Sequence, residues 1–157
     1  MIVYHSSTIK VEHPDIRFSR RFIDFGKGFY VTHLRDQAVK YANRFLDRGQ
    51  NAVLNTYELN TDWKTFNVKR FEKYDSEWLD FVADCRKGNP VPQYDIIEGG
   101  IANDKVFTTV DLYFSDWITK DEALKRLRYE KPNWQICLCT QEIMDKCLKF
   151  IESEEIV

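Results

Sequence analysis

The stretch DFGKGFYVT, Asp24–Thr32, places two glycines around a lysine, directly before aromatic and β-branched residues. Aromatic and β-branched residues favour a strand, and glycines at its entry permit a positive φ or a close approach of two backbones. Two phosphate-binding patterns fail here. A Walker A loop needs Ser or Thr and a helix after the lysine, and a G-x-G-x-x-G loop needs glycine where Val31 stands. The stretch therefore predicts a turn that enters a strand.

Regular elements are predicted on both sides of this turn. MIVYHSS, residues 1–7, is a short apolar run that ends in polar residues, which is typical of a strand. After the turn, apolar residues recur at steps of three and four, which predicts an amphipathic helix that ends at Gly49. The residues that carry this spacing are Leu34, Ala38, Tyr41, Ala42 and Phe45.

The rest of the chain mixes strands and helices without regular alternation. We expect strands in NAVLNTYELN, YDIIEGGIA and NWQICLCT, and a strand or an irregular link in WKTFNVKRF. Helices are expected in DSEWLDFVADCRKGNP, in NDKVFTTVDLYFSDWI, in TKDEALKRLRYE, and as the closing element in QEIMDKCLKFIESEE. The acidic end ESEEIV is expected to be a frayed, solvated tail. This order fits an α+β fold with antiparallel or mixed sheets better than a doubly wound parallel sheet.

Length and charge narrow the class of protein. A chain of 157 residues fits one domain, residues 1–157, and 43% hydrophobic residues give it a globular composition. The net charge of −2 provides no overall basic field for nucleic acid or acidic membranes. The best local basic segment is IRFSRRF, residues 16–22, and a solvated loop is the favoured interpretation of it.

The four cysteines suggest free thiols rather than a disulfide framework or a zinc site. Cys137 and Cys139 alternate along a predicted strand, so they face the same side and suit small buried positions. The cysteines and the three histidines lack metal-ligand spacing, so no metal site is expected. Free thiols, the lack of a signal-peptide pattern and the lack of a long apolar run favour a cytoplasmic protein.

Two stretches taken together resemble a known superfamily. His5-Ser6-Ser7 ends the first strand; after a loop come F-G-K-G-x-Y, a β run and a helix that carries QAVKYA. This pattern resembles the ADP-ribosyltransferase superfamily, in the His-Tyr-Glu branch of the poly(ADP-ribose) polymerases and diphtheria-toxin-like enzymes. The chain also resembles a bacterial family of unknown function placed in that superfamily. That likeness includes WLDFV, YDIIEGGIAND, DEALKRL and QICLCT.

The resemblance implies a split antiparallel β-core with surrounding helices and a cleft for NAD, which serves as co-substrate. His5 would bond the adenosine-side ribose and help to fix the nicotinamide amide. Ser6 stands where the family usually has a glycine whose backbone clasps the carboxamide, and its side chain is expected to crowd the pocket. Tyr30 would stack on the nicotinamide ring, and Gly28 would let the chain approach the cofactor. Ser7 and Phe29 complete the implied cofactor-binding set.

The third motif position departs from the family pattern. The glutamate of the family is best matched by Gln135, with Asn133 at a polar, target-contacting position. A glutamine keeps the hydrogen bond to the nicotinamide-side ribose, but it lacks the negative charge that stabilises a developing oxocarbenium ion. Slow single transfer, or no transfer, is therefore expected rather than chain elongation. Asp104 is an alternative acid, and Glu98 is a weaker one.

The resemblance implies an NAD-dependent mono-ADP-ribosyltransferase, a glycosyltransferase in which His5, Tyr30 and Gln135 form the catalytic set. The acceptor would be a macromolecule, with protein favoured over nucleic acid. The likeness to the bacterial family suggests the toxin of a toxin–antitoxin or phage-defence module, with a small protein antitoxin. Three alternatives stay open: an NAD glycohydrolase, a non-catalytic module that binds NAD or ADP-ribose, and a nucleic-acid modifier that uses the basic segments IRFSRRF and KRLRYEK.

Overall fold

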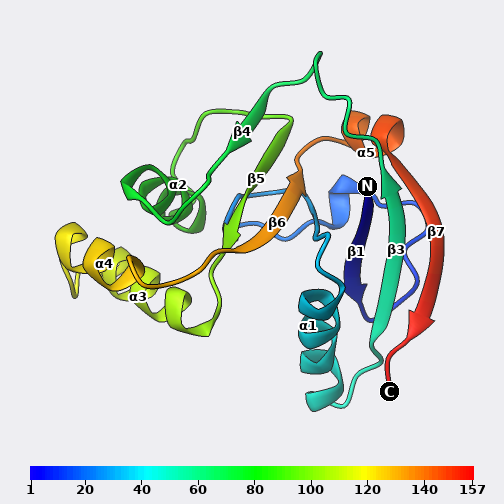
Figure 1. Cartoon of the computed structure of the whole chain (residues 1–157), viewed down its shortest axis with the longest axis horizontal. Coiled ribbons are helices and arrows are strands. Elements are labelled where there is room, and N and C mark those ends of the chain that lie inside the picture. Colours follow the sequence, from blue (N-terminus) through cyan, green and yellow to red (C-terminus); the bar gives the residue numbers. More distant parts are fainter.

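The structure is a computed structural model that describes residues 1–157, and it contains two β-sheets (Figure 1). The three-stranded sheet has the order β1-β3-β7, and the four-stranded sheet has the order β2-β6-β5-β4. All neighbouring strands are antiparallel except β4 and β5, which are parallel. The prediction of an α+β fold with mixed sheets is confirmed. The strands are β1 (Ile2–Ser7), β2 (Phe29–Val31), β3 (Val53–Leu59), β4 (Val68–Arg70), β5 (Ile96–Ile101), β6 (Asn133–Leu138) and β7 (Leu148–Glu155).

Five α-helices and a short 3-10 helix complete the fold. Most of them begin at a side-chain cap: Asp75, Asn103, Thr119 and Thr140 each accept a hydrogen bond from a backbone N–H in the first turn. Gly88 ends α2 with a φ of +73°, as expected for a left-handed C-terminal residue. The helices are η1 (Ile16–Phe18), α1 (Arg35–Asp47), α2 (Ser76–Lys87), α3 (Asp104–Phe114), α4 (Lys120–Leu127) and α5 (Gln141–Cys147).

Two apolar clusters hold the layers together. Side chains alternate along β6, so Ile136 and Leu138 enter one cluster and Cys137 enters the other. The first cluster fills the space between the two sheets and includes Tyr57 and residues of α5. The second lies on the outer face of the four-stranded sheet, under α2, α3 and α4. Figure 1 shows these three helices beside β4 and β5, on the far side of the molecule from β7.

The prediction of one long closing helix is wrong, and so is the prediction of a frayed acidic tail. Helix α5 stops at Cys147, and β7 then pairs with β3 along its whole length, from Leu59 opposite Leu148 to Val53 opposite Glu155. Leu148 and Phe150 are half-buried while Lys149 and Ile151 are exposed, which is the two-residue period of a strand. Strand β3 supplies the hydrogen-bonding partners for the β7 backbone. The sequence of residues 148–155 alone does not reveal this pairing.

Candidate functional site

The two sheets are joined by a backbone bridge between Tyr4 of β1 and Thr32, which directly follows β2. The N–H of Tyr4 donates to the carbonyl of Thr32 at 2.8 Å, and the N–H of Thr32 donates to the carbonyl of Tyr4 at 3.0 Å. The pairing then stops, so β1 and β2 part on the side of Ser6 and Tyr30. Backbone groups alternate in direction along a strand, so those of Ser6 point the same way as those of Tyr4. We refer to the place where the strands part as the β1–β2 opening.

His5 spans the β1–β2 opening. Its Nδ1 lies 2.8 Å from the backbone carbonyl oxygen of Tyr30, and its ring packs on Phe29 with centroids 4.2 Å apart. A carbonyl only accepts, so Nδ1 carries the proton. Burial lowers the pKa of His5 below 6.5, and the bond to Tyr30 opposes this only in part. The ring is therefore neutral near pH 7, and Nε2, which no protein group bonds, is a free acceptor.

The Tyr30 side chain lies on the other face of β2, against the cluster under the helices. Its hydroxyl donates to the carbonyl of Gly26 and accepts from the N–H of Phe25 at 3.1 Å. The rings of Tyr30 and Phe25 are stacked, with centroids 6.5 Å apart. Burial raises the pKa of Tyr30 well above 10, so the hydroxyl stays protonated. The preceding loop thus fixes the ring in one position.

Gly28 is required by the packing of β6. A Cβ at this position would lie 2.3 Å from the Cys137 sulfur and 2.9 Å from the Leu138 carbonyl oxygen. The hydroxyl of Ser19 bonds both backbone groups of Gly28, each at 2.8 Å. The close approach predicted at Gly28 is therefore a contact with a strand of the protein itself.

The two serines after His5 are engaged locally. The Ser6 hydroxyl donates to the carbonyl of Ala38 in α1 at 2.6 Å, so this side chain is held on the helix. The Ser7 hydroxyl accepts from the N–H of Ile9 at 3.4 Å. The backbone of Ser6, rather than its hydroxyl, is thus the part that faces the β1–β2 opening.

Gln135 lies on β6 opposite Gly99, two residues before Cys137, which is opposite Tyr30. Because residues two apart on a strand share a face, Gln135 and Tyr30 lie on the same face of the sheet. The ring of His5 packs on Phe29, on the other face. The side chains of Tyr30 and Gln135 thus lie on one face of the sheet. His5 lies on the other face and is connected to Tyr30 by its hydrogen bond to the Tyr30 backbone.

The two alternative acids occupy different settings. Asp104 begins α3 with a side chain that is 93% exposed, and its carboxylate bonds Arg44 at 3.0 Å. Glu98 on β5 is buried, with a side chain only 9% exposed, and Arg70 approaches its carboxylate at 3.8 Å. It lies opposite Ile136, on the face between the sheets. Glu98 therefore lies on the opposite face of the sheet from Tyr30 and Gln135, whereas Asp104 is an exposed residue that is paired with α1.

Gln37 of α1 is a polar residue that the sequence did not single out. Its Nε2 donates to the carbonyl of Trp134 at 3.2 Å, and the Thr32 hydroxyl donates to the same carbonyl at 2.8 Å. Its Oε1 is the one buried side-chain oxygen or nitrogen that lacks a partner. An unpaired buried acceptor costs about 1–3 kcal/mol. This acceptor belongs to a side chain that bonds Trp134, the residue directly before Gln135. The sequence gives no sign of this contact, because a glutamine early in a helix is an ordinary surface residue.

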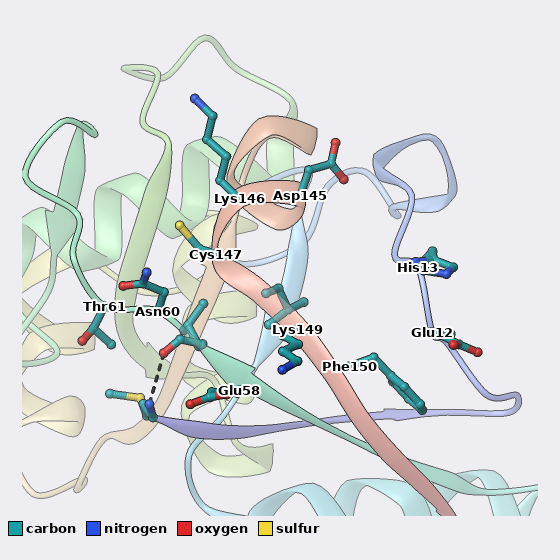
Figure 2. A pocket seen from close by; sticks show the side chains of 13 residues that line it. Glu12, His13, Glu58, Asn60, Thr61, Asp145, Lys146, Cys147, Lys149 and Phe150 are labelled. Carbon is teal, nitrogen blue, oxygen red and sulfur yellow. Dashed lines mark hydrogen bonds between the residues drawn. The ribbon is translucent and has the colours of Figure 1, made fainter.

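A separate hollow of about 840 Å³ opens where α5 meets β7, next to the N-terminus (Figure 2). Acidic and basic groups line it together, among them Glu58, Asp145, Lys146 and Lys149. A second hollow of about 430 Å³ lies beside the loop after β1. Neither hollow is lined by His5. We therefore define the candidate site by the hydrogen-bonding groups at the β1–β2 opening and not by a cavity.

Comparison with known proteins identifies the family. A family model described as "Protein of unknown function (DUF3990)" matches residues 1–150. The chain belongs to the DUF3990 family. No curated protein and no solved structure matches the chain significantly. The region shared with DUF3990 contains the whole β1–β2 opening together with β6. In this DUF3990 chain no helix has the length and apolar character needed to cross a membrane.

Proposed function

We propose that this DUF3990 chain is an NAD-dependent mono-ADP-ribosyltransferase that binds NAD at the β1–β2 opening. The observation that carries the proposal is the His5 ring, which bonds the Tyr30 backbone across the place where the two strands part. The motifs that resemble ADP-ribosyltransferases, which form a split sheet around NAD, fall at this place. Those motifs end β1 and form β2.

The exposed backbone groups suit a carboxamide. The N–H and C=O of Ser6 point toward the β1–β2 opening, and a carboxamide offers the complementary acceptor and donor. The free Nε2 of His5 can accept from a ribose hydroxyl. The unpaired Oε1 of Gln37 offers a further buried acceptor beside β6. These groups give the opening both donors and acceptors without a metal.

The reaction breaks the bond between the ribose C1′ and the nicotinamide nitrogen. An acceptor nucleophile attacks C1′, nicotinamide leaves with the bonding electrons, and the acceptor proton passes to solvent. Gln135 would bond the nicotinamide-side ribose, and Tyr30 would form a fixed aromatic wall. Positioning and fixed dipoles carry most of such a reaction, because positive charge develops on the sugar.

The absence of a carboxylate at position 135 predicts a slow enzyme. The buried candidate acid, Glu98, is held on the opposite face of the sheet beside Arg70. This observation also favours a second candidate function, a module that binds NAD or ADP-ribose without cleaving it. The likeness to a bacterial family extends the proposal to a toxin that is restrained by a small protein antitoxin.

The test is incubation of the purified chain with NAD labelled in the adenylate part, with and without cell lysate. The variants are His5→Asn and Gln135→Ala, and the matched control is His33→Asn, at an exposed histidine. Label that enters macromolecules, and that is lost in both variants but not in the control, supports the transferase.

The same assay separates the alternatives. Release of ADP-ribose without lysate indicates a glycohydrolase. Bound but intact NAD indicates the binding module. If NAD neither binds nor reacts with the wild-type chain, the proposed function is wrong.

A further inference from the structure

Segment Ile16–Phe22 exposes two large aromatic side chains, each next to an arginine in the sequence. Phe18 is 84% exposed and Phe22 is 60% exposed. Arg17, Arg20 and Arg21 are also exposed. Exposed apolar side chains rimmed by polar residues mark interaction sites, and Phe18 and Phe22 lie four residues apart in the sequence among exposed arginines. We call residues 16–22 the basic aromatic segment.

The basic aromatic segment is held in place at its start and its middle. The N–H of Ile16 donates to the side chain of Gln141 at 2.9 Å, and Asp15 caps η1 through the N–H of Arg17 at 2.9 Å. Ser19 makes its two bonds to the backbone of Gly28. A segment that is ordered before binding loses less entropy when a ligand arrives.

Phe22 has an unusual backbone for an aromatic residue, with a φ of +59°. Bulky side chains rarely adopt this region, and such residues gather at functional sites. Its ring lies beside Gly88, where a Cβ would come within 2.5 Å of it. Contact with the end of α2 therefore keeps the ring at the surface.

Two of the three arginines of this segment, Arg20 and Arg21, have no carboxylate partner. Asp15 is paired with Arg17, and Asp24 is paired with Arg86 of α2. Arg20 bonds only the Tyr41 hydroxyl, at 3.3 Å, and Arg21 has no partner. The segment is thus locally cationic on a chain whose net charge is −2.

We propose that the acceptor of this DUF3990 chain is a single-stranded nucleic acid that docks on the basic aromatic segment. This inference rests on the proposed transferase function. Exposed rings stack on bases, and arginines bond phosphates, which is how proteins hold single strands. A duplex hides its base faces, so it offers the rings nothing to stack on. Ser19 ties the segment to Gly28, two residues before Tyr30, so a docked strand lies next to the β1–β2 opening.

In this reaction a ring nitrogen, an exocyclic amine or a hydroxyl of the docked strand supplies the nucleophile. Its bond to C1′ forms as the bond from C1′ to nicotinamide breaks. Nicotinamide leaves, and the proton of the nucleophile passes to solvent. No oxidant or reductant is needed.

The test measures the binding of fluorescent single-stranded DNA and RNA of mixed sequence by anisotropy, without NAD. The variants are Phe18→Ala, Phe22→Ala and Arg21→Gln. The matched controls are Trp117→Ala, at a tryptophan that is 79% exposed after α3, and Lys64→Gln, at an exposed lysine outside the segment.

Loss of one stacking ring is expected to weaken binding about tenfold, because a stacked base contributes about 1–3 kcal/mol. Arg21→Gln should lower the slope of log K against log salt by about 0.7. The controls should bind as the wild type does. Equal losses in the controls, tighter binding to duplex, or tighter binding to anionic lipid vesicles than to single strands would overturn the inference.

Nicotinamide release, measured with the same strands, separates this inference from the proposed function. Release that single strands stimulate, with label on the strand, supports both. Label on lysate proteins without any binding to strands leaves the transferase in place and overturns the nucleic-acid acceptor. Tight binding to strands while NAD stays intact both with strands and with lysate overturns both the transferase and the strand as its acceptor.

Discussion

The Nδ1 of His5 lies 2.8 Å from the carbonyl oxygen of Tyr30, across strands that have ceased to pair. A side chain there replaces the backbone partner that a continuous ladder would have supplied. The bond fixes the tautomer of the ring and leaves Nε2 as a free acceptor at the β1–β2 opening. The same histidine therefore supports the junction of the sheets and offers a group to a ligand.

The first prediction concerns stability at mildly acidic pH. Burial lowers the pKa of His5 in the folded state below 6.5, so between the two pKa values only the unfolded state binds the proton. The free energy of unfolding should therefore be highest at pH values above the pKa that His5 has in the unfolded state. It should fall as the pH decreases from there through the pKa that His5 has in the folded state. Urea denaturation at steps from roughly pH 7 to 5 measures this slope.

His5→Asn should flatten that dependence, because asparagine does not titrate. His33→Asn, at an exposed histidine, is the matched control and should keep the wild-type slope. If His5→Asn and the wild type lose stability in parallel over this range, the titration of His5 does not control it.

Gly28→Ala should destabilise the protein. The added methyl would lie 2.3 Å from the Cys137 sulfur and 2.9 Å from the Leu138 carbonyl oxygen, so β2 or β6 must shift. Overpacking of this kind costs about 1–3 kcal/mol, and a clash with backbone places the expected loss at the upper end.

Chemical denaturation of Gly28→Ala and Gly49→Ala checks this prediction. Gly49 has a φ of +71° and open space around its Cβ position, so its variant reports backbone strain alone. The double variant Gly28→Ala with Cys137→Ala should recover part of the stability, since one of the two clashes is removed. A Gly28→Ala protein as stable as the wild type would contradict the packing described for β2.

Gln135→Glu should increase nicotinamide release about tenfold or more, because a carboxylate adds negative charge beside the developing positive charge. Gln135 shares a face with Tyr30, so the new charge would lie on the aromatic side of the sheet. The measurement is initial release rate at saturating NAD for Gln135→Glu, Gln135→Ala and Glu98→Gln. If Glu98→Gln abolishes release while both Gln135 variants match the wild type, Glu98 is the acid and the assignment of Gln135 fails.

The patterns that were predicted well are the local ones. The capping residues Thr119 and Asp75 begin the helices expected there, and the strands that contain His5 and Tyr30 form where their alternating or β-branched runs lie. Each depends on neighbours in the sequence. The two properties predicted for the glycines before β2 are both present: Gly26 has a positive φ, and Gly28 makes a close approach, whose partner is β6.

What the sequence did not reveal depends on contacts between distant segments. The strand character of Lys149–Glu155 comes from β3, and the role of Gln37 comes from the Trp134 carbonyl. The relation of His5 to Tyr30 is of the same kind. Motif spacing brings both residues to one opening, but the register of the strands decides that their side chains lie on opposite faces.

The last prediction tests β7 as an essential strand. A chain that ends after Cys147 loses the partner of β3 and the Phe150 ring, which packs edge-on against Tyr57 at 5.7 Å. The exposed β3 edge should then drive aggregation, and the cooperative unfolding transition should disappear. The control is a chain that lacks only Val157, which is fully exposed, and it should unfold with a midpoint close to that of the wild type. Light scattering and circular dichroism during thermal unfolding distinguish the two, and a soluble, cooperatively folded chain without residues 148–157 would show that β7 is dispensable.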